Sequence, residues 1–469
     1  WLAQAEAIGE LKTLRGVSWD LEIGVITELV GRRPDKPAIL FDEVPGYPEG
    51  FRVLVNALGS RNRLALTMGL PPGLDEIGLV REWRRRVRET SPLAPRFVDT
   101  GPVMENALVG EDVDILKFPT PKWHELDGGR YIGTGDMVIT RAPDGNWVNC
   151  GTYRVMVHDR NHVGLMIGPT HHGNWHMQGW FARGEPMPVA IVLGMEPLLF
   201  LVSANELPPG ASEYGYAGAV RGEPVEEIRG PITGLPIPAA AEIVLEGFVD
   251  PQERWPEGPF GEFTGYYASG ALPQPMVRLE AVYYRSDPII LGAPPLKPPI
   301  AEMWYMGTVW NALLWDQLEA AGVPDITGVC VHMTRVMLVA VSVRQRYPGH
   351  AKQAGRIASQ SSLRGGMGQI TIVVDEDIDV ADIDEVLWAI CTRVDPDRDI
   401  EVLRDSTSTF MDPMAFPEKK GEPLVHSRLV IDATRPYEWR DRFPEVVASS
   451  PELRQQVLAR WGDKLKGII

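Results

Sequence analysis

Two short apolar runs on either side of a turn decide the fold of the central part of this chain. Met137-Val138-Ile139-Thr140 precedes the turn Pro143-Asp144-Gly145-Asn146, and the run Trp147–Arg154 follows it. Proline, aspartate, glycine and asparagine are favoured in tight turns, whereas β-branched and aromatic residues are favoured in strands. The pattern therefore predicts a β-hairpin.

The region around this hairpin has the same character. From about residue 100 to 300, short apolar runs are separated by glycine and proline, and they predict strands at 163–167, 189–193, 242–248 and 276–283. Many short strands joined by turns are typical of a barrel-like or split sheet. We therefore expect an α+β multidomain chain whose parts are an N-terminal α/β region (1–100), a central split β-barrel domain (101–305), a C-terminal α/β domain (306–450) and a terminal amphipathic helix (451–469).

The flanking regions mix helical and strand patterns. Near the start, 38–41 and 52–56 are predicted strands, and 79–88 is a predicted exposed helix whose Arg84-Arg85-Arg86 run forms a solvated basic face. After residue 305 the patterns predict further elements, namely helices at 309–321, 351–361 and 382–392 and strands within 328–344 and at 370–374.

Composition excludes several classes of protein. The 469 residues include 46 Lys and Arg against 63 Asp and Glu, a formal net charge of −17 that disfavours non-specific binding to nucleic acid or to an anionic membrane. Cys150, Cys330 and Cys391 are far apart in sequence, so we expect no disulfide framework and a reducing, cytoplasmic location. The most apolar stretches are interrupted by charged residues, and the first residues carry no secretory pattern.

One set of polar residues could bind a metal ion. An amide oxygen, an imidazole and a carboxylate suit Mn²⁺ or Mg²⁺, and Asn149, His171 and Glu213 supply these groups. Because they are distant in sequence, a hydrogen-bonded turn asparagine, a surface histidine and an exposed glutamate are the alternative. His172 and His176 are spaced for zinc on one helical face, but Gly173 and Asn174 argue against a helix there.

A second set could transfer protons. Glu257 and Glu262 lie five residues apart in a glycine- and proline-rich turn. If they meet Arg154, its guanidinium would keep one carboxylate ionised while burial keeps the other protonated. An ordinary surface ion pair is the alternative. The acidic run 375–379 could bind a cation, but solvated or helix-capping carboxylates are the simpler interpretation.

The chain has no GxGxxG, Walker A or GxSxG pattern. In its order of motifs it resembles the UbiD family of prenylated-FMN-dependent (de)carboxylases over nearly its whole length. The resemblance is carried by Phe41-Asp42-Glu43-Val44-Pro45-Gly46, Asn56-Ala57-Leu58-Gly59-Ser60-Arg61, Asp127-Gly128-Gly129-Arg130-Tyr131, Asn149-Cys150-Gly151-Thr152-Tyr153-Arg154, Glu257-Gly258-Pro259-Phe260-Gly261-Glu262, Arg346-Tyr347-Pro348-Gly349-His350-Ala351 and Val374-Asp375-Glu376-Asp377-Ile378-Asp379.

The resemblance implies a cofactor site in the central domain. It places a Mn²⁺ (or Mg²⁺) that anchors the prenylated FMN phosphate, with a K⁺ beside it, on Asn149, His171 and Glu213, with His172 as a neighbouring candidate. The residues that would line the cofactor are Asn149, Cys150, Gly151, Thr152, Tyr153, Arg154, Thr170, His171, Ser203, Ala204, Asn205 and Glu213. The cofactor would come from a separate flavin prenyltransferase.

The resemblance also implies the reaction. Arg154, Glu257 and Glu262 would form the catalytic network for reversible, non-oxidative decarboxylation of an aromatic, heteroaromatic or α,β-unsaturated carboxylic acid, with release of CO₂ and with Glu262 as proton donor. The chain would form a homodimer or higher homo-oligomer through its C-terminal domain. A zinc metallohydrolase, or a non-catalytic subunit of a carboxylase complex, is the alternative.

The chain departs from the family pattern at one position, and its substrate is weakly encoded. Many relatives carry a lysine near the position of Gln369 and Ile370, so the phosphate charge would be balanced by Arg364, Arg221 or Lys352 instead, or balanced less fully. By analogy, the segment 291–306 lines the substrate pocket. Its members that could meet an aromatic acid with a second polar group are Trp304, Tyr305 and Lys297.

Overall fold

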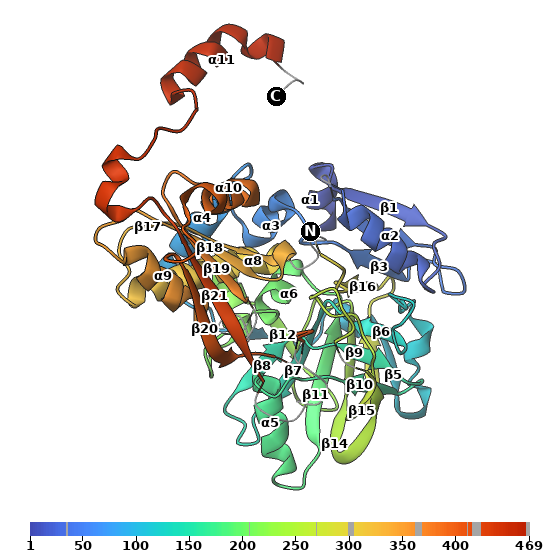
Figure 1. Cartoon of the computed structure of the whole chain (residues 1–469). Helices are drawn as coiled ribbons and strands as arrows, with labels where there is room; N and C mark the ends of the chain where they lie inside the picture. The colour runs from blue at the N-terminus through green and yellow to red at the C-terminus, as the bar shows by residue number, and fades with distance from the viewer. Residues whose placement is uncertain are drawn as a thin grey trace.

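The computed structural model describes residues 1–33, 36–205, 207–268, 270–298, 304–361, 368–409, 411–414 and 424–465. It is a mixed α/β chain with a large curled sheet at its centre, and this confirms the predicted fold class (Figure 1). In the described part of the chain, no helix combines the length and the apolar character that crossing a bilayer requires.

A small sheet organises the N-terminal region. Its strands run in the order β1 (Leu11–Arg15), β2 (Ala38–Asp42), β3 (Arg52–Val55) and β16 (Ile289–Gly292). The predicted strands at 38–41 and 52–56 are confirmed, but β16 comes from a segment far along the chain. The neighbouring helices are α1 (Leu2–Ala7), α2 (Glu22–Gly31), α3 (Arg61–Met68) and α4 (Glu76–Glu89).

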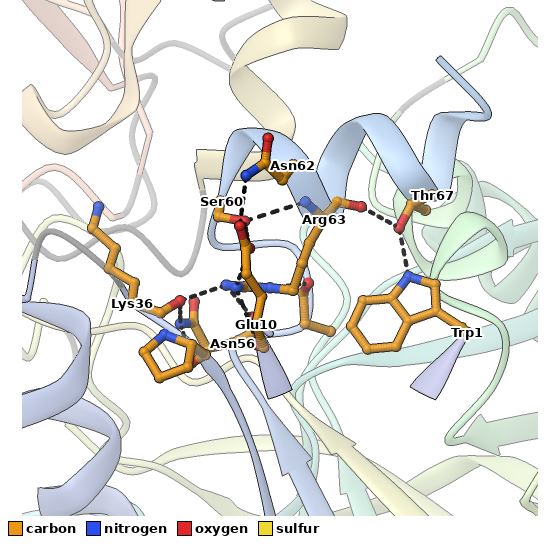
Figure 2. Close-up of polar contacts among 10 residues, drawn as sticks. Trp1, Glu10, Lys36, Asn56, Ser60, Asn62, Arg63 and Thr67 are labelled. Carbon is orange, nitrogen blue, oxygen red and sulfur yellow. Dashed lines mark hydrogen bonds and ion pairs between the residues drawn. The ribbon is translucent and has the colours of Figure 1, made fainter. Parts of the chain in front are cut away.

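A fully buried arginine ties this region together. The Arg63 guanidinium on α3 forms an ion pair with Glu10 at 2.8 Å and donates hydrogen bonds to the backbone oxygens of Lys36, Asn56 and Ala57 (Figure 2). The donors of a buried guanidinium must all find acceptors, and here carbonyl groups of two loops supply them. The contacts fix these loops against the start of α3.

The central sheet contains the predicted hairpin. Strands β7 (Asp136–Arg141) and β8 (Val148–Gly151) pair antiparallel, with Thr140 opposite Asn149. The nine-stranded sheet follows the order β6-β9-β10-β15-β14-β11-β7-β8, and β5 pairs with β15. The bounds of the other strands are β5 (Asn106–Val109), β6 (Arg130–Gly133), β9 (Val155–Val157), β10 (His162–Leu165), β11 (Met187–Leu193), β14 (Ile243–Glu257) and β15 (Leu272–Tyr284).

Three helices accompany this sheet, and a smaller sheet lies beside it. The helices are α5 (His172–Phe181), α6 (Pro197–Ser203) and α7 (Glu213–Arg221), and the smaller sheet is β13 (Pro236–Pro238), β12 (Glu226–Arg229) and β4 (Arg96–Phe97). Inward-facing residues of the large sheet, among them Tyr131 and Ile191, form an apolar core together with Phe260 of the turn after β14. This core backs the site described below.

The C-terminal region is a five-stranded sheet with helices. Its strand order is β17 (Ile326–His332), β18 (Leu338–Val343), β19 (Ile370–Asp375), β21 (Val425–Ala433) and β20 (Ile400–Thr407). The helices are α8 (Trp304–Ala320), α9 (His350–Ser359) and α10 (Ile383–Arg393), as the sequence patterns predicted. A last helix, α11 (Pro451–Leu465), stands clear of the body of the molecule (Figure 1).

Two local predictions are wrong. Helix α4 is not a solvated basic face throughout, because Arg84 is buried and pairs with Asp316 and Glu319 of α8. The segment that starts at His172 is helical despite its glycine and asparagine. Buried side chains of α5, among them His176, pack against the sheet, and tertiary packing outweighs weak helix propensity.

Candidate active site

An arginine and two glutamates form a buried cluster at the end of β14. The Arg154 guanidinium donates to both carboxylate oxygens of Glu257, from Nε at 2.9 Å and from Nη2 at 2.7 Å. Its Nη1 donates to Glu262 Oε1 at 2.6 Å. Glu257 is 1% exposed and Glu262 is 8% exposed, so the alternative of an ordinary surface ion pair is wrong.

A tyrosine that sequence reasoning did not assign to the site completes this cluster. Tyr131, fully buried on β6, donates its hydroxyl to Glu257 Oε1 at 2.9 Å. The Tyr131 ring packs on the Phe260 ring with centroids 4.0 Å apart, and the Arg154 guanidinium lies 5.5 Å from the centroid of the Phe260 ring. The motif 127–131 contributed to the family resemblance, but nothing in its sequence indicated that the Tyr131 hydroxyl would contact Glu257.

The glycine-rich motif before Tyr131 positions the two glutamates. Gly128 donates its N–H to Pro259 O at 2.8 Å, and a Cβ on Gly128 would lie 2.0 Å from Gly258 O. Asp127 accepts from the Gly261 N–H at 3.3 Å. Close approach of backbone to backbone requires glycine here. The two motifs therefore hold the turn between Glu257 and Glu262 in place.

The electrostatics of the cluster are asymmetric. Burial raises the pKa of Glu262; Arg154 opposes that effect and the charge of Glu257 adds to it. Burial alone would lower the pKa of Arg154, but its two ion pairs raise it, so the guanidinium stays charged. Burial, and next the Glu257 charge, raise the pKa of Tyr131, which therefore remains a donor. Glu262 is the member best suited to carry a proton near neutral pH.

The metal-ligand candidates come from three segments that contact one another. Asn149 is buried on β8, and its amide donates to the Tyr153 hydroxyl at 3.4 Å. The same hydroxyl accepts from Gly173 N at 3.2 Å, and the Tyr153 ring lies 5.6 Å from that of His171. Tyr153 thus links the Asn149 strand to the start of α5.

Glu213 reaches the same strand from α7. Its side chain is buried, and its Oε2 has no hydrogen-bond partner within the described residues. Burial raises the pKa of Glu213 to about 7, while its own backbone N–H and that of Cys150 act in the opposite direction. A buried carboxylate oxygen left without a donor is expensive unless a cation or a ligand satisfies it. The alternative of a turn asparagine and an exposed glutamate is wrong.

The predicted cofactor-lining segments also meet. Thr152 donates its N–H to Ser203 O at 3.1 Å, and the two hydroxyl groups lie 3.1 Å apart. The Asn205 amide group donates to Leu201 O at 2.6 Å, and its buried Oδ1 has no partner among the described residues. Strand β8 and the end of α6 therefore share one polar surface.

The zinc alternative loses support. His172 and His176 do share α5, but Trp147 packs edge-on against both rings at 4.9 and 4.6 Å. His176 Nδ1 lies 2.9 Å from the Thr140 hydroxyl, and burial lowers the pKa of His176 to about 4. Within the described ranges, no three histidine, cysteine or acidic residues are grouped to hold a metal.

The groups considered for phosphate and substrate binding have varied surroundings. Arg221 pairs with Glu196 and with Glu223, and Lys352 donates to Arg398 O at 2.8 Å. Gln369 lies 3.4 Å from the Asp412 carboxylate. Arg364 and the side chains of Trp304 and Tyr305 lie outside what the structure describes.

Lys297 is exposed, and its segment adjoins the active-site turn. A Cβ on Gly265 would meet Pro298 at 2.8 Å and Lys297 at 3.3 Å. The proposed substrate segment therefore packs against the turn that follows Glu262.

In the acidic run 375–379, Asp375 and Asp377 pair with Arg393, and Asp377 also pairs with Arg435. These ion pairs explain the run without a bound cation.

Comparison with known proteins assigns this chain to a class of carboxy-lyases that act as decarboxylases. The chain belongs to the UbiD family, and the predicted resemblance and enzyme class are confirmed. Models of the 3-octaprenyl-4-hydroxybenzoate carboxy-lyase N-terminal, Rift-related and C-terminal domains match residues 2–82, 96–298 and 303–433.

Named relatives act on aromatic acids. The pyrrole-2-carboxylic acid decarboxylase of Pseudomonas aeruginosa is 34% identical, over 95% of this chain and 93% of its own length. A phenolic acid decarboxylase of a Streptomyces species is 33% identical, over 92% and 90%. The chain is thus similar throughout its length to decarboxylases of this family.

Solved structures agree with this assignment. The UbiD-class enzyme HmfF of Pelotomaculum thermopropionicum, in complex with FMN, has a TM-score of 0.85 and 30% identity, covering 98% of this chain and 99% of its own. An evolved dimeric form of HmfF holds prFMN, with a TM-score of 0.81, 29% identity and 98% coverage of both chains. The open form of vanillic acid decarboxylase from Sedimentibacter hydroxybenzoicus has a TM-score of 0.86 at 29% identity, covering 100% and 97%.

Proposed function

We propose that this chain catalyses reversible, non-oxidative decarboxylation of an aromatic, heteroaromatic or α,β-unsaturated carboxylic acid, using prenylated FMN and a divalent metal. The observation that carries the proposal is the buried cluster in which Arg154 holds Glu257 by two hydrogen bonds and Glu262 by one. When bound, a prenylated flavin supplies the electron sink that this reaction needs.

In this proposal the chain's own residues manage the proton. Three N–H groups of Arg154 are directed at the two glutamates, which favours orientation of Glu262 as the role of Arg154. Glu262 holds a proton because burial raises its pKa, and it donates that proton to the carbon from which CO₂ has departed. Glu257 fixes the guanidinium by accepting two hydrogen bonds from it.

The cofactor and its metal would bind where β8, α5, α6 and α7 meet. Glu213 Oε2 and Asn205 Oδ1, which have no hydrogen-bond partner among the residues that the structure describes, suit a site that a ligand completes. Asn149, Glu213 and the imidazole of His171, or of its neighbour His172, are the proposed Mn²⁺ or Mg²⁺ ligands. The surrounding stretches 149–154, 170–171 and 203–205 would line the flavin, and a K⁺ beside the divalent ion remains a prediction.

Substrate class and assembly complete the proposal. The named relatives favour a planar aromatic or heteroaromatic acid, which would enter between the flavin and the segment that carries Lys297. We further propose that the chain forms a homo-oligomer through its C-terminal region. Helix α11 stands clear of the body and exposes apolar side chains, which are Leu453, Val457, Leu458 and Trp461.

The decisive experiment uses protein co-expressed with a flavin prenyltransferase. Absorption and mass spectra should show prenylated FMN, and the loaded protein should release CO₂ from pyrrole-2-carboxylate or from a phenolic acid. Protein purified without the prenyltransferase is the control and should be inactive. Zinc bound in place of flavin, with hydrolase activity, would contradict the proposal.

A further inference from the structure

The buried cluster contains one guanidinium and two carboxyl groups, and Tyr131 influences which carboxyl group carries a proton. One guanidinium faces two carboxylates in a largely buried site, so a single proton on one carboxyl group makes the cluster neutral. Proton transfer needs that proton on Glu262. The Arg154 contacts alone favour ionised Glu257 by two hydrogen bonds to one.

Tyr131 increases this difference. Its hydroxyl donates to Glu257 Oε1 at 2.9 Å, so Glu257 accepts three hydrogen bonds where Glu262 accepts one from a side chain. A hydrogen bond to a charged carboxylate stabilises the ionised form specifically. The ring is held between the sheet core and Phe260, which fixes the hydroxyl oxygen beside Glu257; the other acceptor in reach, Pro259 O, is more distant at 3.5 Å.

The other titratable groups around Glu257 do not replace this hydrogen bond. His158 lies close by, since a Cβ on Gly164 would be 2.8 Å from His158 Nε2 and 3.3 Å from Glu257 Cγ. Its Nε2 is buried and has no hydrogen-bond partner in the described part of the chain, and burial lowers the pKa of His158. Asp127 acts on Tyr131 only through its charge.

We propose that Tyr131 is a positioning residue that keeps Glu257 ionised and thereby reserves the transferable proton for Glu262. This inference deepens the proposed function and rests on it. In these terms the active form of the enzyme has Glu257 ionised and Glu262 protonated. The acid limb of the kcat profile then marks the pH at which this arrangement of the proton is lost, and its alkaline limb marks the loss of the proton from Glu262.

The test compares Tyr131→Phe with Tyr284→Phe in loaded enzyme. The first variant keeps the ring on Phe260 and removes the hydroxyl. The midpoint of the acid limb in the kcat profile should therefore move to a higher pH by about one to two units. Above that limb, kcat should largely recover. Tyr284 is buried on β15, where its hydroxyl accepts from Lys117 at 2.7 Å, and its variant should keep the parent profile. A uniform fall of kcat with an unmoved acid limb would overturn the proposal.

A second measurement does not depend on turnover. Infrared titration of the unloaded protein follows the C=O stretch of protonated carboxyl groups. In Tyr131→Phe, one carboxyl group should become protonated at a pH about one to two units higher than in the parent protein. This difference should vanish in the double variant Tyr131→Phe/Glu257→Gln. The shift should persist in a His158→Gln background. Its loss there would assign the titration to His158 and overturn the proposal.

The two measurements separate the possible failures. If no acid is decarboxylated but the infrared shift appears, the proposed reaction is wrong and the Tyr131–Glu257 coupling is right. If Tyr131→Phe does not fold, Glu257→Gln provides the reciprocal test. Its residual activity should lack the acid limb, and a limb that remains at its original pH would overturn the assignment.

Discussion

Arg154 and Glu257 lie 103 residues apart in sequence, yet they share two parallel hydrogen bonds of 2.9 and 2.7 Å. This fork geometry is specific to a guanidinium facing a carboxylate, and it fixes the plane of both groups. The remaining guanidinium nitrogen of Arg154, Nη1, donates a hydrogen bond to Glu262. The pair therefore determines where the proposed proton donor lies.

Loss of the proton donor should abolish turnover while leaving the fold intact. Glu262→Gln keeps the size of the side chain but cannot supply the proton, so kcat should fall by about 10²- to 10⁴-fold. Incorporation of solvent deuterium into the product should fall in parallel, while the flavin spectrum persists. The exposed Glu185→Gln is the matched control and should retain full activity. Undiminished turnover in Glu262→Gln would remove this residue from the mechanism.

The same carboxyl group predicts an alkaline limb. Burial raises the pKa of Glu262, with Arg154 opposing and Glu257 adding to the effect. Only the protonated form donates, so kcat should be retained below this raised pKa and lost as pH rises through it. The kcat profile of loaded enzyme checks this. In Glu262→Gln the residual activity should show no such limb, and an identical limb in both proteins would assign it to another group.

Removal of a proposed metal ligand should release the metal. Glu213→Gln should weaken manganese binding by more than the roughly 10- to 100-fold that loss of an outer-shell partner costs. Metal analysis after dialysis against EDTA measures this. Glu76→Gln is the matched control, because burial raises the pKa of Glu76, like that of Glu213, to about 7, but Glu76 lies on α4.

The same measurement decides between the two histidines. Whichever of His171→Ala and His172→Ala loses the metal identifies the ligand. Full manganese retention in Glu213→Gln would contradict the proposed site.

The buried arginine of the N-terminal region should be important for stability. Arg63→Met removes the ion pair to Glu10 and the hydrogen bonds that Arg63 donates to the backbone oxygens of Lys36 and Asn56, at a cost of about 3–5 kcal/mol. Urea unfolding measures the loss. Arg85→Met, which removes an exposed arginine that pairs with Glu82 and Glu89, should leave the free energy of unfolding almost unchanged. Equal losses in the two variants would contradict the role of Arg63.

Helix α11 should be needed for self-association. A chain that ends before Pro451 loses the exposed apolar side chains of this helix. Its molar mass by light scattering should correspond to a smaller species than that of the full chain. As a control, Glu452→Gln changes a charge on the helix without removing apolar area, and it should assemble as the parent does. Unchanged assembly after truncation would place the interface elsewhere.

Several features were predictable because their causes are local in sequence. The hairpin of β7 and β8 follows from its turn residues, and the C-terminal helices and strands follow from their periodicity. The order of the motifs indicated the family. The prediction from local helix propensity was wrong for α5, because the packing of His172 and His176 outweighs the low helix propensity of Gly173 and Asn174. It failed also for Arg84, which α8 buries.

The sequence by itself determined which chemical groups are available: an arginine, two glutamates five residues apart, and amide, imidazole and carboxylate groups that could hold a metal. Only the tertiary structure decided which of these are buried together, and it added Tyr131 to Glu257. The physical reason is that ionisation depends on burial and on neighbours within a few ångströms. The curled sheet brings those neighbours together from β6, from the residue before β9 and from the end of β14, which are far apart in the chain.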